Sequence, residues 1–425
     1  MLTKNNINNN AFIILSLFII PILVQLFFPL LNITLFNPYV YPILLLIFIL
    51  FFYILNNFIT SKKVYKITNI FYLNLIIFNS FELITIFFKG LYDNDLLNAY
   101  RISLPFLGSL LIINLLKQKE ILKEFNYKLF FNKFSFYLGI FVIIQVLLSM
   151  YESVTGNYLV STKYLGSNET RDILIIFGYS LSNLLGFRFL FGGIYFHHNV
   201  FGTVLLLYNF IFLIRYYESR KLIFLLFLTV VFIAVLGNTS RFAIFTIILT
   251  NLIIFYKIFK KTTKFVIIPI TVVLLSLYFN SLIHKWNLYF NQSNSLIVRE
   301  NLWSYLFKTK ILSFNLKETF IGLGIHDYIN FASDFSGKSS LENTYLIQFV
   351  LLGIIGLSSF LFVFHIYPLL KARRIFGSEK IFIVLFVLNI FLPSLVGATF
   401  FYFPCYILLS IIYSKISFIS KPSYK

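Results

Sequence analysis

The sequence predicts an all-α membrane protein, a single domain over residues 1–425 with about twelve transmembrane helices. Of its residues, 59% are hydrophobic and 12% are charged, whereas globular chains carry roughly 25% charged residues. Apolar runs of about 20 residues, the length that crosses a bilayer as a helix, recur along the chain. Short turns rich in Lys and Arg separate these runs and alternate with turns that hold few basic residues.

This alternation predicts the orientation of the chain, because loops rich in Lys and Arg stay in the cytoplasm. Lys62, Lys63 and Lys66 follow the second apolar run, and Lys117 and Lys119 follow the fourth. Both termini are therefore expected inside, with the first run kept as an uncleaved span. We expect spans near residues 11–30, 40–59, 102–116, 199–214, 222–236, 242–256, 265–282, 344–365, 381–396 and 399–414, with two more that end near residues 88 and 150.

Two longer stretches are expected on the outer side, a smaller loop at 151–196 and a large loop at 283–343. The smaller loop contains an apolar piece broken by Gly and Ser-Asn, which predicts an interfacial or re-entrant segment. The large loop ends in an apolar helix over 344–365. A membrane protein with one large loop usually keeps its chemistry there, so we expect a functional site at the outer face.

Composition argues against several classes of function. The formal charge of +20 does not indicate nucleic-acid binding, because the Lys and Arg lie mostly in turns between spans. The single Cys405 forbids an internal disulfide and gives no basis for a metal cluster. His197 and His198 are adjacent and do not share a helix face, so a metal pair is not expected. Gly322-Leu323-Gly324 is interpreted as a turn, since no strand and helix surround it as in a nucleotide site.

Three arginines are expected at the outer face: Arg188 before the span at 199–214, Arg241 in the GNTSR turn, and Arg299 in the large loop. Guanidinium groups grip phosphate oxygens with two parallel hydrogen bonds, so converging arginines suit a lipid diphosphate. The alternative for Arg241 is an interfacial anchor at a helix end. The alternative for Arg188 and Arg299 is an ordinary loop charge.

Two acidic residues are further candidates. Glu82 lies within an apolar run, where a charge costs roughly 2.5–3.5 kcal/mol, so it should face a cavity or a partner. Glu342 precedes the helix at 344–365 and is expected at the mouth of the bundle. On that helix one face is expected to carry Glu342, Tyr345, Phe349, Gly353 and Gly356, whose glycines would allow close helix packing. His365 is expected at the inner end of the same helix, at the membrane interface.

Four short motifs occur in a fixed order: Arg188 followed by HHNVFG, SRFA at a helix start, RENLW and then GLG in the large loop, and ENTYLIQFVLLGIIGL. With about twelve spans, this pattern resembles the O-antigen polymerase and O-antigen ligase superfamily. The resemblance covers residues 188–357, and the spans before it match only in character.

That resemblance implies a metal-independent glycosyltransferase without a cofactor, at the outer face of the bacterial cytoplasmic (inner) membrane. Its donor and acceptor would be glycans linked to undecaprenyl diphosphate. Ligases of the family move the finished glycan to lipid A core in lipopolysaccharide, and polymerases extend a chain of repeat units. The ligases commonly carry His just before the Asn/Ser-x-Tyr-Leu stretch, where this chain has Glu342, which favours a polymerase of O-antigen or capsule. A ligase and a flippase or transporter of the lipid-linked glycan are the alternatives.

By position, the resemblance makes Arg241 and Arg299 the residues beside the diphosphate, where they would stabilise the leaving group. Glu342, or alternatively Glu82, would take the proton of the acceptor hydroxyl. Further contacts with substrate are expected from Arg188, His197, His198, Asn199, Asn343, Tyr345 and Glu82. Membrane lipid, a chain-length regulator and a flippase are the expected partners, and nucleic acid is not.

Overall fold

The computed structural model describes about two fifths of the chain. The described residues are 127–155, 175–176, 179–180, 198–238, 241–258, 304, 308, 311–324, 327–328, 331, 343–373, 378–395 and 403–418. The spans expected near 11–30, 40–59, 102–116 and 265–282, and the one ending near 88, lie outside these residues.

Six helices coincide with predicted spans. Two further elements are the two-residue strands β1 (Ile175–Ile176) and β2 (Tyr179–Ser180), which pair antiparallel within the smaller predicted loop. The prediction of a helical fold is thus confirmed for the described residues, while the number of spans stays a prediction. The six helices are α5 (Tyr127–Thr155), α7 (His198–Ser219), α8 (Leu222–Asn238), α9 (Arg241–Ile258), α16 (Ser378–Ser394) and α17 (Phe403–Phe418).

Two described stretches, Lys128–Tyr151 and Thr344–Arg373, are long and apolar enough to cross a membrane. The first is most of α5, and the second is a run of three helical pieces described below. These two stretches support association of the protein with a membrane, while the number of spans stays a prediction.

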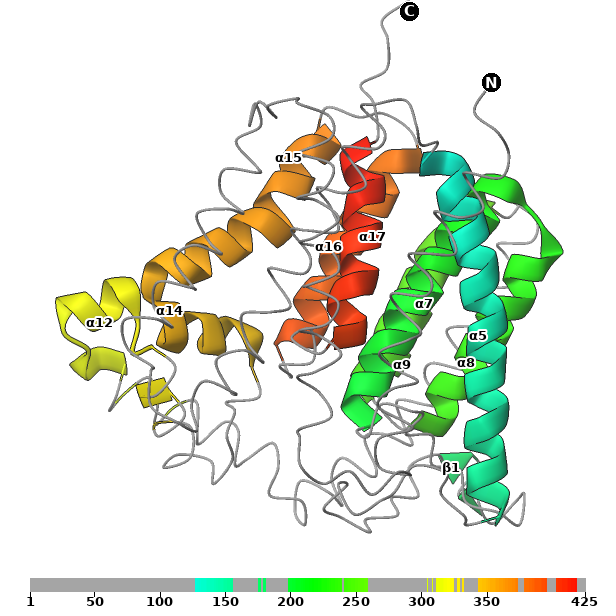
Figure 1. Ribbon diagram of the computed structural model, residues 1–425, viewed down its shortest axis with the longest axis horizontal. Coiled ribbons are helices and arrows are strands. Elements are labelled where there is room, and N and C mark those ends of the chain that lie inside the picture. The colour runs from blue at the N-terminus through cyan, green and yellow to red at the C-terminus, as the bar shows by residue number, and fades with distance from the viewer. Residues whose placement is uncertain are drawn as a thin grey trace, which may run out of the picture.

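Helix α7 forms the centre of the bundle. Every residue from 201 to 215 is buried, and α5, α8, α9, α16 and α17 pack around it (Figure 1). Nearly all of these residues are apolar on every side of the helix, and such a helix is stable only when protein or lipid surrounds it completely. The core of the described region therefore follows from the sequence of α7 itself.

The charged residues of the bundle gather at one end. The two residues Arg220 and Lys221 join α7 to α8, so these helices are antiparallel. Tyr217 near the end of α7 contacts Phe382 near the start of α16, and Glu218 pairs with Lys415 near the end of α17. We call this the basic end, and its charged residues are Lys128, Lys133, Arg215, Glu218, Arg220, Lys221, Lys257, Lys371, Arg373, Glu379, Lys380 and Lys415. The opposite end, where α7 and α9 begin and α16 finishes, we call the motif end.

Helix α14 (Thr344–Leu361) is broken at Gly353, which has φ 67° and ψ −162°. The hydroxyl of Tyr345 lies 3.0 Å from Nε2 of His365, whereas a straight helix would separate residues twenty positions apart by about 30 Å. The helix therefore folds back into two arms, residues 344–352 and 354–361, as Figure 1 shows. The prediction of a continuous helix over 344–365, with Tyr345, Gly353 and Gly356 on one face, is wrong. Gly353 has a positive φ that breaks the helix, and its lack of a side chain also lets the backbone of Phe320 in α12 approach closely.

After the break, the second arm continues through a π-helical turn, η5 (Phe362–Ile366), into α15 (Tyr367–Arg373). The amide of Tyr367 donates to the carbonyl of Phe362, as a π-turn requires. The carbonyl of Val363 accepts instead from the hydroxyl of Tyr413 on α17, at 3.2 Å. Residues 354–373 are long enough, at about 30 Å, to cross a bilayer without the first arm.

Part of the large predicted loop packs against this break. It contains the 3-10 turn η4 (Ile311–Ser313) and the short helix α12 (Leu316–Ile321). Gly322 and Gly324 have φ 79° and 80°, so the prediction of a turn here is confirmed. The amides of Leu323 and Gly324 donate to the carbonyls of Val350 and Leu351, at 2.8 and 3.1 Å. The last carbonyls of a helix lack helical partners, so this turn caps the first arm of α14.

Candidate functional site

The motif end collects the predicted site residues that the structure describes. His198 and Asn199 open α7, and Arg241 is the first residue of α9. Asn343 caps α14 and contacts the carbonyl of Leu395, just beyond the end of α16. Because α7 and α9 are parallel and both pack on α16, these backbone positions belong to one end of the bundle.

The remaining predicted site residues are not placed. Glu82, Arg188, His197, Arg299 and Glu342 lie outside the described residues. The side chains of His198, Asn199 and Arg241 also lie outside them, so for these three only the helix position is known. Whether the three arginines converge stays a prediction.

Asn343 connects two helices at the motif end. Its Oδ1 accepts the amide of Leu346 at 3.0 Å, which satisfies one free donor of the first turn of α14. Its Nδ2 donates to the carbonyl of Leu395 at 3.0 Å. The side chain is buried, so the role seen for Asn343 is to fix the start of α14 against the end of α16. Its predicted contact with substrate stays a prediction.

Tyr345 and His365 form a polar pair between the first arm of α14 and the π-helical turn η5. The Tyr345 hydroxyl lies 3.0 Å from His365 Nε2 and 3.5 Å from the carbonyl oxygen of Phe391 on α16. The Tyr345 ring contacts Phe360 in the second arm. His365 is 7% exposed, so other side chains cover it, and its predicted place at the inner membrane interface stays a prediction. A phenol hydrogen-bonded to an imidazole can pass a proton to or from it.

Sequence reasoning missed this pair because a straight helix would hold its members far apart. One signal could have revealed it, namely Gly353 within an apolar run, since glycine is the residue that tolerates positive φ. Pro368 also follows His365 by three residues and has no amide hydrogen to donate.

Gln348 adds an unusual polar group to the first arm. The residue is fully buried, and neither its Oε1 nor its Nε2 has a hydrogen-bond partner. The Nδ1 atom of His365 also has none. A buried polar group without a partner costs about 1–3 kcal/mol. Such groups often mark places where water or a ligand binds. The amide of Gln348 could therefore accept and donate hydrogen bonds to a bound molecule, close to the motif at the start of α14.

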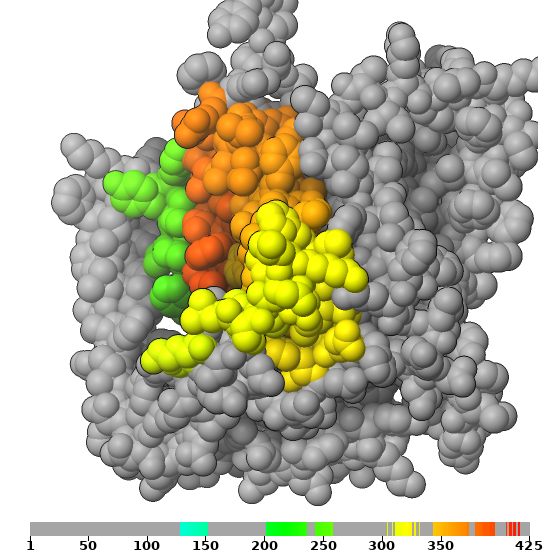
Figure 2. Space-filling model, turned by 90° about the vertical axis from the view of Figure 1, so that its left-hand side faces the viewer, coloured from blue at the N-terminus to red at the C-terminus, as the bar shows by residue number. Residues whose placement is uncertain are grey.

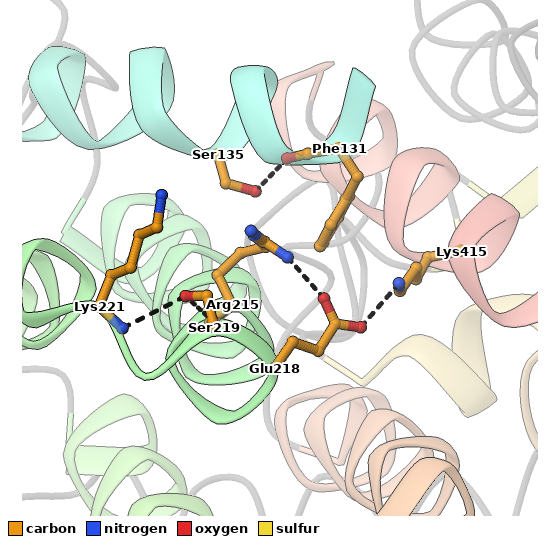
Figure 3. A network of polar contacts seen from close by, with 7 residues as sticks. All are labelled: Phe131, Ser135, Arg215, Glu218, Ser219, Lys221 and Lys415. Atoms are coloured by element: carbon orange, nitrogen blue, oxygen red, sulfur yellow. Dashed lines mark hydrogen bonds and ion pairs between the residues drawn. The ribbon is translucent and has the colours of Figure 1, made fainter. Parts of the chain in front are cut away.

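The basic end has a different arrangement, shown in Figure 3. Glu218 accepts from Nη1 of Arg215 at 2.6 Å and from Nζ of Lys415 at 2.8 Å. The guanidinium of Arg215 lies over the ring of Phe224, and the ammonium of Lys415 lies over the ring of Phe131. These contacts join α7 to α8 and α17, and α17 to α5. The charges here hold helices together and so are not available to a ligand.

Metal ligands do not gather in the described part of the chain. No group of three or more His, Cys, Asp or Glu side chains there could hold a metal ion, and Cys405 is a free, buried thiol in α17.

Comparison with known proteins adds no assignment. No protein-family model and no curated protein matches the sequence of this chain. The functional argument therefore rests on the residues and their arrangement.

Proposed function

We propose that this protein is a membrane glycosyltransferase that polymerises lipid-linked oligosaccharide repeat units into O-antigen or capsular polysaccharide. Its substrates would be glycans carried on undecaprenyl diphosphate at the outer face of the bacterial cytoplasmic membrane. One observation carries the proposal: the described positions of three motifs, at His198, Arg241 and Asn343, lie at the end of the bundle opposite the basic end. Motifs that are far apart in the sequence thus share a location.

The chemistry proposed for the motif end suits a diphosphate. Arg241 opens α9, and helix N-termini favour anions because their first amides are free and the helix dipole is positive there. With Arg299 it would hold the diphosphate and stabilise the negative charge that grows as the bond from sugar C1 to oxygen breaks. Direct attack by the acceptor hydroxyl would invert the anomeric centre.

The proton of the acceptor hydroxyl needs a base within hydrogen-bonding reach. Glu342 is the first candidate, since it precedes Asn343, whose two hydrogen bonds fix the start of α14. Glu82 is the second. We add the pair Tyr345 and His365 as a third candidate, because its groups are 3.0 Å apart and Tyr345 lies in the first turn of the helix that the motif begins.

The orientation proposed places the basic end in the cytoplasm and the motif end outside. The gathering of Lys and Arg at one end of the described helices supports it. A flippase would deliver the lipid-linked unit to the outer leaflet, and a chain-length regulator would be a further partner.

The test is polymer synthesis by the purified protein in proteoliposomes. The vesicles would contain the undecaprenyl-diphosphate repeat unit isolated from the producing strain. A ladder of longer lipid-linked glycans is expected. Transfer to added lipid A core would identify a ligase, and movement of the unit across the bilayer without any transfer would identify a transporter. Arg241→Lys and Arg299→Lys are the matched variants, since Lys keeps the charge and loses the paired hydrogen bonds. Wild-type ladders from both variants would remove the two arginines from the site.

A further inference from the structure

The segment from Ile311 to Gly324, here called the α12 segment, exposes a row of large apolar side chains. Leu312 and Leu316 are each 79% exposed and Phe320 is 50% exposed. The spacing of four residues places Leu316 and Phe320 on one side of α12. Apolar surface left in water costs roughly 25 cal/mol per Å². We therefore expect another apolar surface or medium to cover this row.

The position of the α12 segment identifies the kind of partner. Figure 1 shows α12 at the side of the bundle, level with the first arm of α14 and within the length of the bundle helices. Figure 2 shows the same segment from that side, lying against α14. Ile354 and Ile366 of the adjoining helical run are also exposed. In a membrane protein, exposed apolar side chains on the side of the helical bundle face lipid.

An apolar medium offers few hydrogen-bond partners, so backbone groups placed in it must pair within the protein. Much of the backbone of the α12 segment is paired in this way. Asn315 and Glu318 form a capping box at the start of α12, with bonds of 2.8 and 3.0 Å. The amide of Gly322 donates to the carbonyl of Glu318 at 2.8 Å, and the next two amides donate to α14. The amides of Asn315 and Glu318 before and in the first turn, and those of Gly322, Leu323 and Gly324 after the last, are thus paired within the protein.

The charges of the segment fit the surface of a phospholipid bilayer. Lys317 in the segment and Lys308 just before it are exposed, whereas the carboxylate of Glu318 bonds to the amide of Asn315 within the capping box. Lysine can lay its methylene chain along apolar surface and reach lipid phosphates with its ammonium group. A helix with this combination lies at the boundary between head groups and acyl chains.

We propose that the α12 segment is a membrane-surface anchor: Leu312, Leu316 and Phe320 enter the leaflet at the motif end, with Lys317 among the phosphates. The segment is thus not the water-exposed loop that the sequence predicts. Since the Gly322 turn joins it to the break in α14, the anchor also sets the depth of the arm that carries Tyr345. This inference requires a membrane protein but not a glycosyltransferase.

The test uses a fluorescent label on a single cysteine. Cys405→Ala removes the native thiol, and Leu316→Cys or Leu312→Cys adds the site for an environment-sensitive NBD label. The full-length protein is reconstituted into phosphatidylcholine and phosphatidylglycerol vesicles. We expect doxyl-labelled phosphatidylcholine to quench both labels strongly and iodide, present on both sides of the membrane, to quench them weakly. Two positions guard against one variant that fails to fold, and variants are compared only when they elute as the parent does in size-exclusion chromatography.

Asp327→Cys is the matched control, because Asp327 is exposed and follows the glycine turn by three residues. Its label should be quenched by iodide several-fold more strongly than the label at position 316. Equal iodide quenching at 316, 312 and 327 would show a water-exposed segment and overturn the proposal. Quenching by neither agent at 316 and 312 would show that protein covers the row, and would also overturn it. Polymer synthesis is measured separately, so its absence would count against the proposed function alone.

Discussion

The two ends of the bundle are held together by different chemistry. At the basic end, Glu218 lies between Arg215 of its own helix and Lys415, and the ion pair with Lys415 joins α7 to α17. At the motif end, the described contacts are neutral: the amide group of Asn343 joins α14 to Leu395, and backbone hydrogen bonds join the glycine turn to α14.

This difference indicates where charge is available for a ligand. A cation already paired with a carboxylate, as Arg215 and Lys415 are with Glu218, gains little from a second anion. Substitutions at the basic end should therefore change stability and leave turnover intact. Substitutions of charged residues at the motif end should lower turnover and leave stability intact. The predictions below test that contrast, from the largest expected effect to the smallest.

The largest effect is expected at Glu342. The amide in Glu342→Gln keeps the size and cannot accept a proton, so polymer synthesis should fall about 10²–10⁴-fold if Glu342 is the base. The protein should remain as abundant and as thermostable as the parent. The measurement is the initial rate of polymer formation at equal protein.

Glu342→Asp and Glu342→Ser supply the contrast. If the carboxylate only favours the start of α14, a contribution of about 0.3–1 kcal/mol, both should support synthesis nearly as well as Glu. A fully active Glu342→Gln would transfer the base role to Glu82 or to the pair Tyr345 and His365.

The break at Gly353 is the next point to test. Its φ of 67° with ψ of −162° is a conformation that essentially only glycine adopts, and a methyl group would overlap the backbone of Phe320. Gly353→Ala should lower the free energy of unfolding by about 3 kcal/mol, as strain of this kind costs about 1–3 kcal/mol before any overlap. The thermal midpoint in detergent measures it. Ser359→Ala on the second arm is the control and should change little, and equal midpoints for the two variants would contradict the break.

At the basic end, Glu218→Gln leaves Arg215 and Lys415 without their shared anion. Loss of one partner of a buried pair costs about 3–5 kcal/mol, and since Glu218 is partly exposed we expect about 1–3 kcal/mol. Glu379→Gln, an exposed carboxylate at the same end, should cost less than about 0.5 kcal/mol. Turnover of both variants should match the parent when measured well below the thermal midpoint. If Glu218→Gln lost most of its turnover without losing stability, the basic end would have a role in turnover and the proposed contrast between the two ends would be wrong.

The smallest effect is expected for the hydrogen bond between Tyr345 and His365. Tyr345→Phe removes the hydroxyl and leaves both ring nitrogens of His365 without a partner, at a cost of about 1–3 kcal/mol. A double-mutant cycle with His365→Leu isolates the pair, and we expect a coupling energy of about 1 kcal/mol. A coupling energy near zero would mean that the arms of α14 do not meet at these residues.

The sequence predicted most of the described helices because their signals are local. The apolar runs near 222–236 and 242–256 became α8 and α9, and the short basic turn after α7 appeared where Arg220 and Lys221 stand. The gathering of charge at one end also followed from the sequence, since alternating basic turns and antiparallel helices dictate it. The turn at Gly322 was predicted from glycine alone.

Other features depended on partners distant in the sequence. The pairing of Glu218 with Lys415 spans almost two hundred residues, and local periodicity carries no such information. The predicted face of the helix at 344–365 failed for the same reason. Gly353 is compatible with both a straight helix and a break, and the docking of the glycine turn onto Val350 and Leu351 selects the break.

A helical, largely apolar chain, the positions of most of its described helices and the end at which its charges gather all follow from the sequence, because hydrophobic length and Lys/Arg placement act residue by residue. Only the tertiary structure decided that α14 folds back and that Tyr345 meets His365. It alone placed the α12 segment at the side of the bundle. The physical reason is that a carbonyl released by a helix break must find another donor, and which donor reaches it depends on how distant segments pack.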